Sequence, residues 1–180
     1  MHFRLLLTPG YTWTKRGLIE YTNSVLNTTN AYICNSRPRR FGKSYAANML
    51  AAYYSKGADS EKMFSELEIG KNEDFKKHLN KYDVIHIDIQ WFLANCDDVD
   101  NVVKHIAEAV LDELRVAYPG ILPPEIFSLP DALSRIKDKT GQKFIVIVDE
   151  WDVLIRDEAA NKKHRKITSY KKGKNPVSTE

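Results

Sequence analysis

The sequence predicts an α/β fold in which helices flank a parallel sheet, and three observations point to it. A short strand-like run, residues 31–35, leads through a basic turn into an alanine-rich helical segment, residues 45–54. A second strand-like run spans residues 84–89, with helical segments on both sides of it. A third run, residues 144–148, consists of five apolar residues, mostly β-branched, and is typical of a central strand buried on both faces. Strands that alternate with helices in this way indicate parallel pairing.

The junction between the first strand and its helix carries Gly42, Lys43 and Ser44. Gly-Lys-Ser between a strand and a helix is typical of a phosphate-binding loop, since the free N–H groups of the helix N-terminus bind anions. In such a loop Lys43 would reach the β- and γ-phosphates, and the Ser44 hydroxyl would ligate Mg²⁺. The full pattern has a glycine five residues before Gly42, where this chain has Arg37. Taken alone, the segment is equally compatible with a solvated basic turn.

The third strand ends in two carboxylates, Asp149 and Glu150. Adjacent acids repel each other, so a use for both is expected. In an ATPase with a phosphate-binding loop, the aspartate orients the Mg²⁺ shell and the glutamate activates the attacking water. Ligands of open α/β sheets bind at the carboxyl ends of the strands, so both motifs would face one crevice. The alternative is a core strand with capped acids, and the upstream Gly-Lys-Ser in the correct order makes it the weaker interpretation.

The shorter helices follow from hydrophobic periodicity and from turn residues. They are expected at residues 17–27, 73–79 and 131–139, and Gly141 is expected to end the last of them. Residues 55–70 lack a clear period and are expected to form a loop. Four apolar side chains would anchor this loop, namely Met63, Phe64, Leu67 and Ile69.

One longer amphipathic helix opens at Asp98 and ends near residues 118–120. Its apolar residues recur at helical spacing and are expected to face the core. They are Val99, Val102, Val103, Ile106, Val110 and Leu114.

The composition is that of a globular protein, because 43% of the 180 residues are hydrophobic and 28% are charged. This length suits one domain with its own core. No stretch approaches the roughly 18 apolar residues that a membrane span needs, so no membrane partner is expected. Cys34 and Cys96 form neither a disulfide pattern nor a metal-ligand spacing, which indicates the reduced cytoplasm.

The net charge of +3 hides an asymmetry along the chain. Residues 161–180 contain seven lysines and arginines and one glutamate, while the other 160 residues carry 20 basic and 23 acidic side chains. Because this basic segment has few apolar residues, it is expected to be a disordered, solvated tail. Electrostatic binding of nucleic acid by the tail is the less favoured alternative.

Histidines and other acids offer weaker candidates for chemistry. His86 and Asp88 share side-chain parity on the second strand, but Asp88 at a strand end is expected to cap a helix or to lie beside the crevice. His78, His105 and His164 have no partners at metal-ligand spacing, so the sequence does not indicate a metal enzyme.

Together the two motifs resemble the predicted AAA-ATPase-like family of bacterial proteins. Its members carry an Arg-Pro-Arg-Arg-Phe-Gly-Lys-Ser loop, present here as residues 37–44, so an arginine at the first glycine position is the family's own variant. They also carry a hydrophobic strand that ends in Asp-Glu-Tyr/Trp-Asp, present here as residues 149–152. Residues 14–19 resemble the family's entry segment, with its aspartate replaced by Thr14. The resemblance covers roughly residues 15–160.

The resemblance implies an additional-strand P-loop fold that binds ATP with Mg²⁺ and hydrolyses it. It implies that Lys43 and Glu150 are catalytic, that Ser44 and Asp149 hold Mg²⁺, and that the loop binds the nucleotide. The nucleotide-binding residues that it implies are Arg39, Arg40, Phe41, Gly42, Lys43, Ser44 and Tyr45. Trp151 and Asp152 are expected to shape the floor of the crevice.

The same resemblance divides the chain into a partial P-loop domain, residues 1–160, and the basic tail, residues 161–180. Relatives continue with strands and helices that supply sensor residues, the rest of the sheet and a helical lid, so the fold is expected to be truncated after the acidic-ended strand. Such a sheet would have three strands with the P-loop strand at an exposed edge, which a protein partner or a second copy would cover. A nucleotide-binding switch, or an inactive fragment, is the alternative to an active ATPase.

Overall fold

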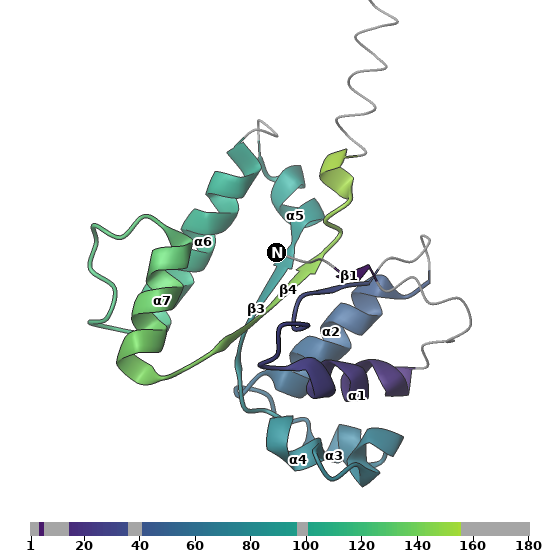
Figure 1. Cartoon of the computed structure of the whole chain (residues 1–180). Helices are drawn as coiled ribbons and strands as arrows, with labels where there is room; N and C mark the ends of the chain where they lie inside the picture. The colour runs from purple at the N-terminus through teal and green to yellow at the C-terminus, as the bar shows by residue number, and fades with distance from the viewer. Residues whose placement is uncertain (1–3, 6–14, 36–40, 97–100, 156–180) are drawn as a thin grey trace, which may run out of the picture.

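The computed structural model describes residues 4–5, 15–35, 41–96 and 101–155 of the chain (Figure 1). Helices and strands alternate along it, as the sequence predicts. In chain order the elements are β1 (Arg4–Leu5), α1 (Lys15–Val25), β2 (Ile33–Cys34), α2 (Lys43–Tyr54), α3 (Glu61–Ser65), η1 (Glu68–Lys71), α4 (Phe75–His78), β3 (Asp83–Asp88), α5 (Ile89–Ala94), α6 (Val102–Ala117), α7 (Leu129–Thr140) and β4 (Phe144–Asp149).

The strands form two parallel pairs. β3 and β4 pair over their full length, from Asp83 opposite Phe144 to Asp88 opposite Asp149. β2 pairs with the two-residue strand β1. The parallel α/β arrangement is therefore confirmed, but the expected single sheet of three strands is wrong for the described residues. There the edge of β2 is covered by β1, which the sequence did not predict, and β4 and β2 belong to different sheets.

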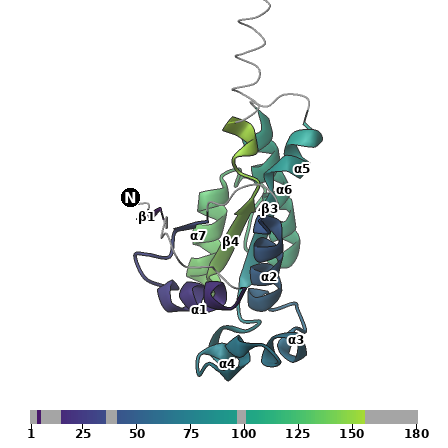
Figure 2. The same cartoon turned by 90° about the vertical axis from the view of Figure 1, so that its right-hand side faces the viewer.

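The two faces of the β3–β4 pair contact two different cores, because neighbouring side chains of a strand point to opposite faces. Ile85, Ile87 and Phe144 pack with α6 and α7. Val84 and Ile145 pack with the core of α1 and α2. Figures 1 and 2 show the pair running between these two groups of helices, with α3 and α4 beyond the end of α2.

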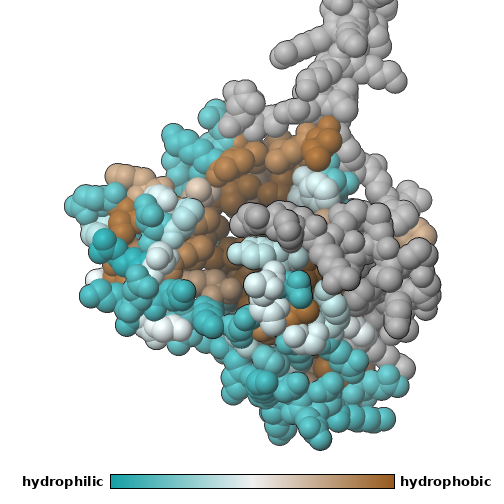
Figure 3. All heavy atoms as spheres, in the orientation of Figure 1, coloured by the Kyte–Doolittle hydropathy of each residue, from teal (hydrophilic) through white to brown (hydrophobic). Residues whose placement is uncertain are grey.

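β4 is less covered than the sequence predicts. Val146 and Val148 are 52% and 44% exposed, so the expected burial on both faces is wrong. These two side chains share the face that α6 and α7 cover, but only Phe144 of β4 packs in that core. Figure 3 shows hydrophobic residues exposed in the middle of this view, between the two groups of helices. The carboxyl half of β4 therefore remains accessible on one face.

The long helix α6 has the expected amphipathic pattern with one correction. Val102, Ile106, Val110 and Leu114 are buried, as the spacing of three and four residues predicts. Val103 is 68% exposed and was wrongly assigned to the apolar face. The expected opening residue Asp98 and its neighbour Val99 lie outside the described residues.

A buried polar network holds the C-terminal end of α2 against α1. The hydroxyls of Tyr54 and Thr22 lie 2.6 Å apart, and Tyr54 also donates to Asn23 Oδ1 at 2.7 Å. Asn23 Nδ2 donates to the Tyr53 hydroxyl at 3.1 Å. Burial raises the pKa of the Tyr54 phenol well above its usual range, so this hydroxyl stays protonated and can donate.

The segment predicted as a loop, residues 55–70, contains two short helices, α3 and η1. Phe64 and Ile69 are buried as expected, whereas Met63 and Leu67 are 57% and 43% exposed and do not anchor it. At the end of α7, Gly141 has a φ of 71° and is the C-cap residue, as predicted.

Candidate functional site

The first half of the candidate site is the turn that precedes α2. Gly42 is the N-cap residue of α2, with a φ of 76° that favours glycine. Its carbonyl oxygen accepts the first helical hydrogen bond, from the Ala46 N–H at 3.0 Å. Lys43 and Ser44 are then the first two residues of the helix, where backbone N–H groups have no acceptor within the helix. The predicted strand-to-helix junction is confirmed, with the helix starting two residues earlier than expected.

The second half is the turn that follows β4. Asp149 is the last residue of the strand, and its Oδ1 accepts a hydrogen bond from the Glu150 N–H at 2.9 Å. Glu150 has a φ of 53°, in the left-handed region that costs a residue with a side chain about 1–2 kcal/mol. Its carbonyl oxygen accepts from the Val153 N–H at 3.1 Å, and Val153 is buried. A tight turn anchored in the core therefore fixes the backbone of both acids.

The strained turn leads to a stability prediction. Glu150→Gly is expected to be about 1 kcal/mol more stable than Glu150→Ala, because both lack the carboxylate and only glycine relieves the left-handed backbone. Urea unfolding of the two variants measures the difference. The same two substitutions at Glu125, an exposed residue without a positive φ, serve as the matched control. If glycine gives no advantage over alanine at position 150, the turn is not strained.

The two halves face each other across a cavity of about 710 Å³. Its walls come from α1, β2, α2 and β4, and they are mainly apolar. Lys43, Asp149 and Glu150, which are far apart in the sequence, all line it. Asn35, the residue after β2, and Trp151 line it as well. The carboxyl ends of β2 and β4 thus meet at one cavity, as expected for parallel strands.

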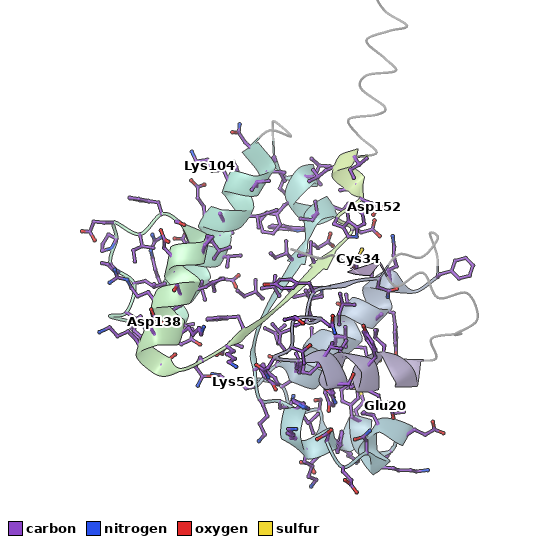
Figure 4. The ribbon with its side chains drawn as sticks, viewed as in Figure 1. Glu20, Cys34, Lys56, Lys104, Asp138 and Asp152 are labelled. Carbon is purple, nitrogen blue, oxygen red and sulfur yellow. The ribbon has the colours of Figure 1, made fainter. Side chains whose placement is uncertain are left out.

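An ion pair joins the two halves. Lys43 Nζ lies 3.7 Å from Asp152 Oδ1, and these side chains are 19% and 30% exposed. Figure 4 shows Asp152 beyond the end of β4, on the side where Cys34 of β2 lies, while Lys56 lies at the other end of the sheet. The pairing of Lys43 with Asp152 was missed from the sequence, which predicted only that Asp152 shapes the crevice floor.

Among the other residues expected to bind the nucleotide, three lie in the described part of the chain and two lie outside it. Phe41 and Tyr45 flank the start of α2 and are 63% and 56% exposed. Ser44 is also exposed. Arg39 and Arg40 lie outside the described residues.

Two of the weaker candidates, Asp88 and His78, have structural roles. Asp88 caps α5, since its Oδ1 accepts from the Trp91 N–H at 3.2 Å, and this role was predicted. His78 is buried with its Nδ1 2.6 Å from the Tyr82 hydroxyl, and this burial lowers the pKa of its imidazole. Among the described residues no three His, Cys, Asp or Glu side chains gather in a way that could hold a metal ion.

Comparisons with known proteins identify a family. Residues 2–173 match the AAA-ATPase-like family, which is described as a predicted AAA-ATPase. No curated protein matches the chain, and no solved structure matches it. None of the helices in the described part of the chain is both long and apolar enough to cross a lipid bilayer.

Proposed function

The chain belongs to the predicted AAA-ATPase family, and we propose that it binds ATP with Mg²⁺ where the N-terminus of α2 faces the end of β4. The main observation in support of this proposal is that Lys43, Asp149 and Glu150 line the same cavity. A cation at a helix N-terminus opposite two carboxylates suits a phosphate chain with its metal ion. The Lys43 ammonium and the backbone N–H groups at the start of α2 would bind the phosphates, and the carboxylates would face the metal and the attacking water.

The residues at the start of α2 would bind the phosphates. The backbone N–H groups after Gly42 point out of the helix end and would donate to the β-phosphate oxygens. The Lys43 ammonium would neutralise charge on the β- and γ-phosphates. Phe41 and Tyr45, which are exposed beside this turn, belong to the same nucleotide-binding set.

A bound Mg²⁺ would take one or two protein oxygens together with phosphate oxygens and waters. Asp149 presents a carboxylate that the Glu150 N–H orients at 2.9 Å, and the Ser44 hydroxyl is exposed at the helix start. These two residues would hold the ion. When bound, Mg²⁺ would neutralise the negative charge that develops on the phosphate oxygens.

Glu150 would act as the general base for hydrolysis. Its backbone is fixed in the turn after β4, and Glu150 is one of the residues that line the cavity. It would accept a proton from the attacking water while Lys43 stabilises the phosphate charge. Positioning a base in this way contributes typically a factor of about 10²–10⁴ to the rate.

Nucleotide binding without turnover is the second candidate. Val146 and Val148, on the half of β4 that leads to the site, are exposed, and Trp151 is 45% exposed. An open site excludes water poorly, and electrostatic stabilisation of the transferred phosphate is weaker where water enters. This openness favours a switch that binds ATP and changes conformation without rapid hydrolysis.

Calorimetric titration of the purified chain with ATP tests the proposal, with phosphate release followed in the same samples. Binding is expected with Mg²⁺ and is expected to weaken at least several-fold in EDTA, because the metal offsets repulsion between phosphates and carboxylates. Binding without phosphate release would select the switch over the ATPase. A folded chain that binds no nucleotide under either condition would contradict the proposed function.

A further inference from the structure

The ion pair between Lys43 and Asp152 ties the phosphate-binding turn to the strand opposite it. Lys43 is the first residue of α2, and Asp152 lies three residues after the end of β4. Their charged atoms are 3.7 Å apart, which is within ion-pair distance but longer than a strong hydrogen bond. The cation that would bind phosphate is thus already next to a carboxylate in the ligand-free chain.

The position of Asp152 is set by the turn after β4. The Val153 N–H donates to the Glu150 carbonyl oxygen at 3.1 Å, which closes this turn. The Val153 side chain is buried in the core that α6 and α7 build on the sheet. An anchored neighbour limits how far the Asp152 backbone can follow Lys43 when the lysine side chain moves.

Asp149 and Asp152 differ in what their carboxylates contact. Asp149 accepts from the adjacent Glu150 N–H, which orients it at the strand end. Asp152 instead makes the ion pair with Lys43 at the start of α2. The two aspartates of the Asp-Glu-Trp-Asp segment therefore differ in their partners: Asp149 is bonded within its own turn, and Asp152 contacts the lysine of α2.

We propose that Asp152 is the resting counter-ion of Lys43, which the phosphates of an incoming nucleotide must displace. The inference deepens the proposed function and rests on it, since it concerns the same site and the same triphosphate ligand. In the ligand-free chain, the Asp152 carboxylate neutralises the Lys43 ammonium, and a phosphate oxygen bound at Lys43 would take its place. It also comes close to the Asp152 carboxylate, so the two anions repel each other. Asp152 thereby lowers the affinity for nucleotide and holds the lysine in place until a nucleotide arrives.

Asp152→Asn tests this role because it removes the charge and keeps the size of the side chain. The variant is expected to bind ATP and ADP about two- to fivefold more tightly than the wild-type chain, the range given by partly exposed ion pairs. The gain is expected to shrink as salt is raised, because salt screens the repulsion that the substitution removes. Asp138→Asn is the matched control, since Asp138 is exposed on α7 and lies far from the site in Figure 4. Calorimetric titrations of the three proteins measure the effect.

An affinity of Asp152→Asn that is equal to or weaker than that of Asp138→Asn overturns the proposal. A second measurement distinguishes failure of the counter-ion proposal from failure of the proposed nucleotide-binding function. In the nucleotide-free chain, Asp152→Asn is expected to lower the melting temperature when Lys43 is present and to have a smaller effect in the Lys43→Met background. If no protein binds nucleotide but this coupling is present, the proposed function fails while the ion pair stands. If the two substitutions are additive, the pair does not form and the inference fails.

Discussion

Replacing Lys43 with alanine is expected to weaken binding of MgATP by about 100-fold. Truncating one partner of a close charge pair costs about 2–5 kcal/mol, and 100-fold corresponds to about 2.7 kcal/mol. The expectation lies near the lower end of this range because Lys43 is 19% exposed and the phosphates keep their contacts with the helix N–H groups. Calorimetric titration of both proteins with ATP and Mg²⁺ measures the loss.

The matched control for this variant is Lys56→Ala. Lys56 also forms an ion pair, with Asp83 at 2.8 Å, but this pair lies at the amino end of β3 and away from the cavity. Its removal is expected to leave nucleotide affinity within about twofold, since partly exposed surface pairs contribute little. Equal affinities of Lys43→Ala and Lys56→Ala would show that Lys43 does not bind phosphate.

Glu150→Gln is expected to lower the rate of phosphate release by about 10³-fold while nucleotide affinity changes by less than about threefold. Glutamine keeps the shape of the side chain but cannot accept the proton of the attacking water, and a general base contributes about 10²–10⁴ to a rate. Single-turnover phosphate release measures the chemical step, and calorimetry measures binding in the same preparations.

Glu113→Gln serves as the control for this prediction, because Glu113 is an exposed residue of α6 with the same chemistry. A Glu150→Gln variant that hydrolyses ATP at the wild-type rate would remove Glu150 from the mechanism. A wild-type chain that binds ATP without releasing phosphate would instead favour the switch, and Glu150→Gln would then have no rate to reduce.

The parts of the fold that the sequence predicts well are those fixed by local chemistry. Gly42 before α2 and Gly141 after α7 are confirmed as helix boundaries, and both have a positive φ. The apolar, mostly β-branched run at residues 144–148 predicts β4, and the sequence also predicts its parallel partner β3. In each case the information lies within a few neighbouring residues.

The parts that the sequence did not predict depend on contacts between distant segments. β1 has two residues, too few to show any period, and it exists through its pairing with β2. Val103 fits the helical period of α6, but the packing of the helix on the sheet leaves it outside the core. Ile89 continues the apolar pattern of β3, so the sequence places it at the end of the strand, whereas it is the first residue of α5.

In the candidate site, too, the sequence predicts the local features but not the contacts between distant segments. Each half could be recognised separately, Gly-Lys-Ser from its place before a helix and Asp-Glu from its place after a strand. That Lys43 pairs with Asp152 could not be recognised, because neither charge type nor spacing selects among three acids in four residues. Only the distance between the two side chains in the folded structure supplies that information.

The most direct test of the central claim is a two-dimensional amide NMR titration of the isotope-labelled chain with MgATP. The largest chemical-shift changes are expected at residues 42–45 and 149–152, in the two turns that form the candidate site. Residues around Lys56, at the amino end of β3, are expected to be unaffected. Changes confined to other surfaces, or no change at saturating nucleotide in a folded chain, would contradict the claim that this junction is a nucleotide-binding site.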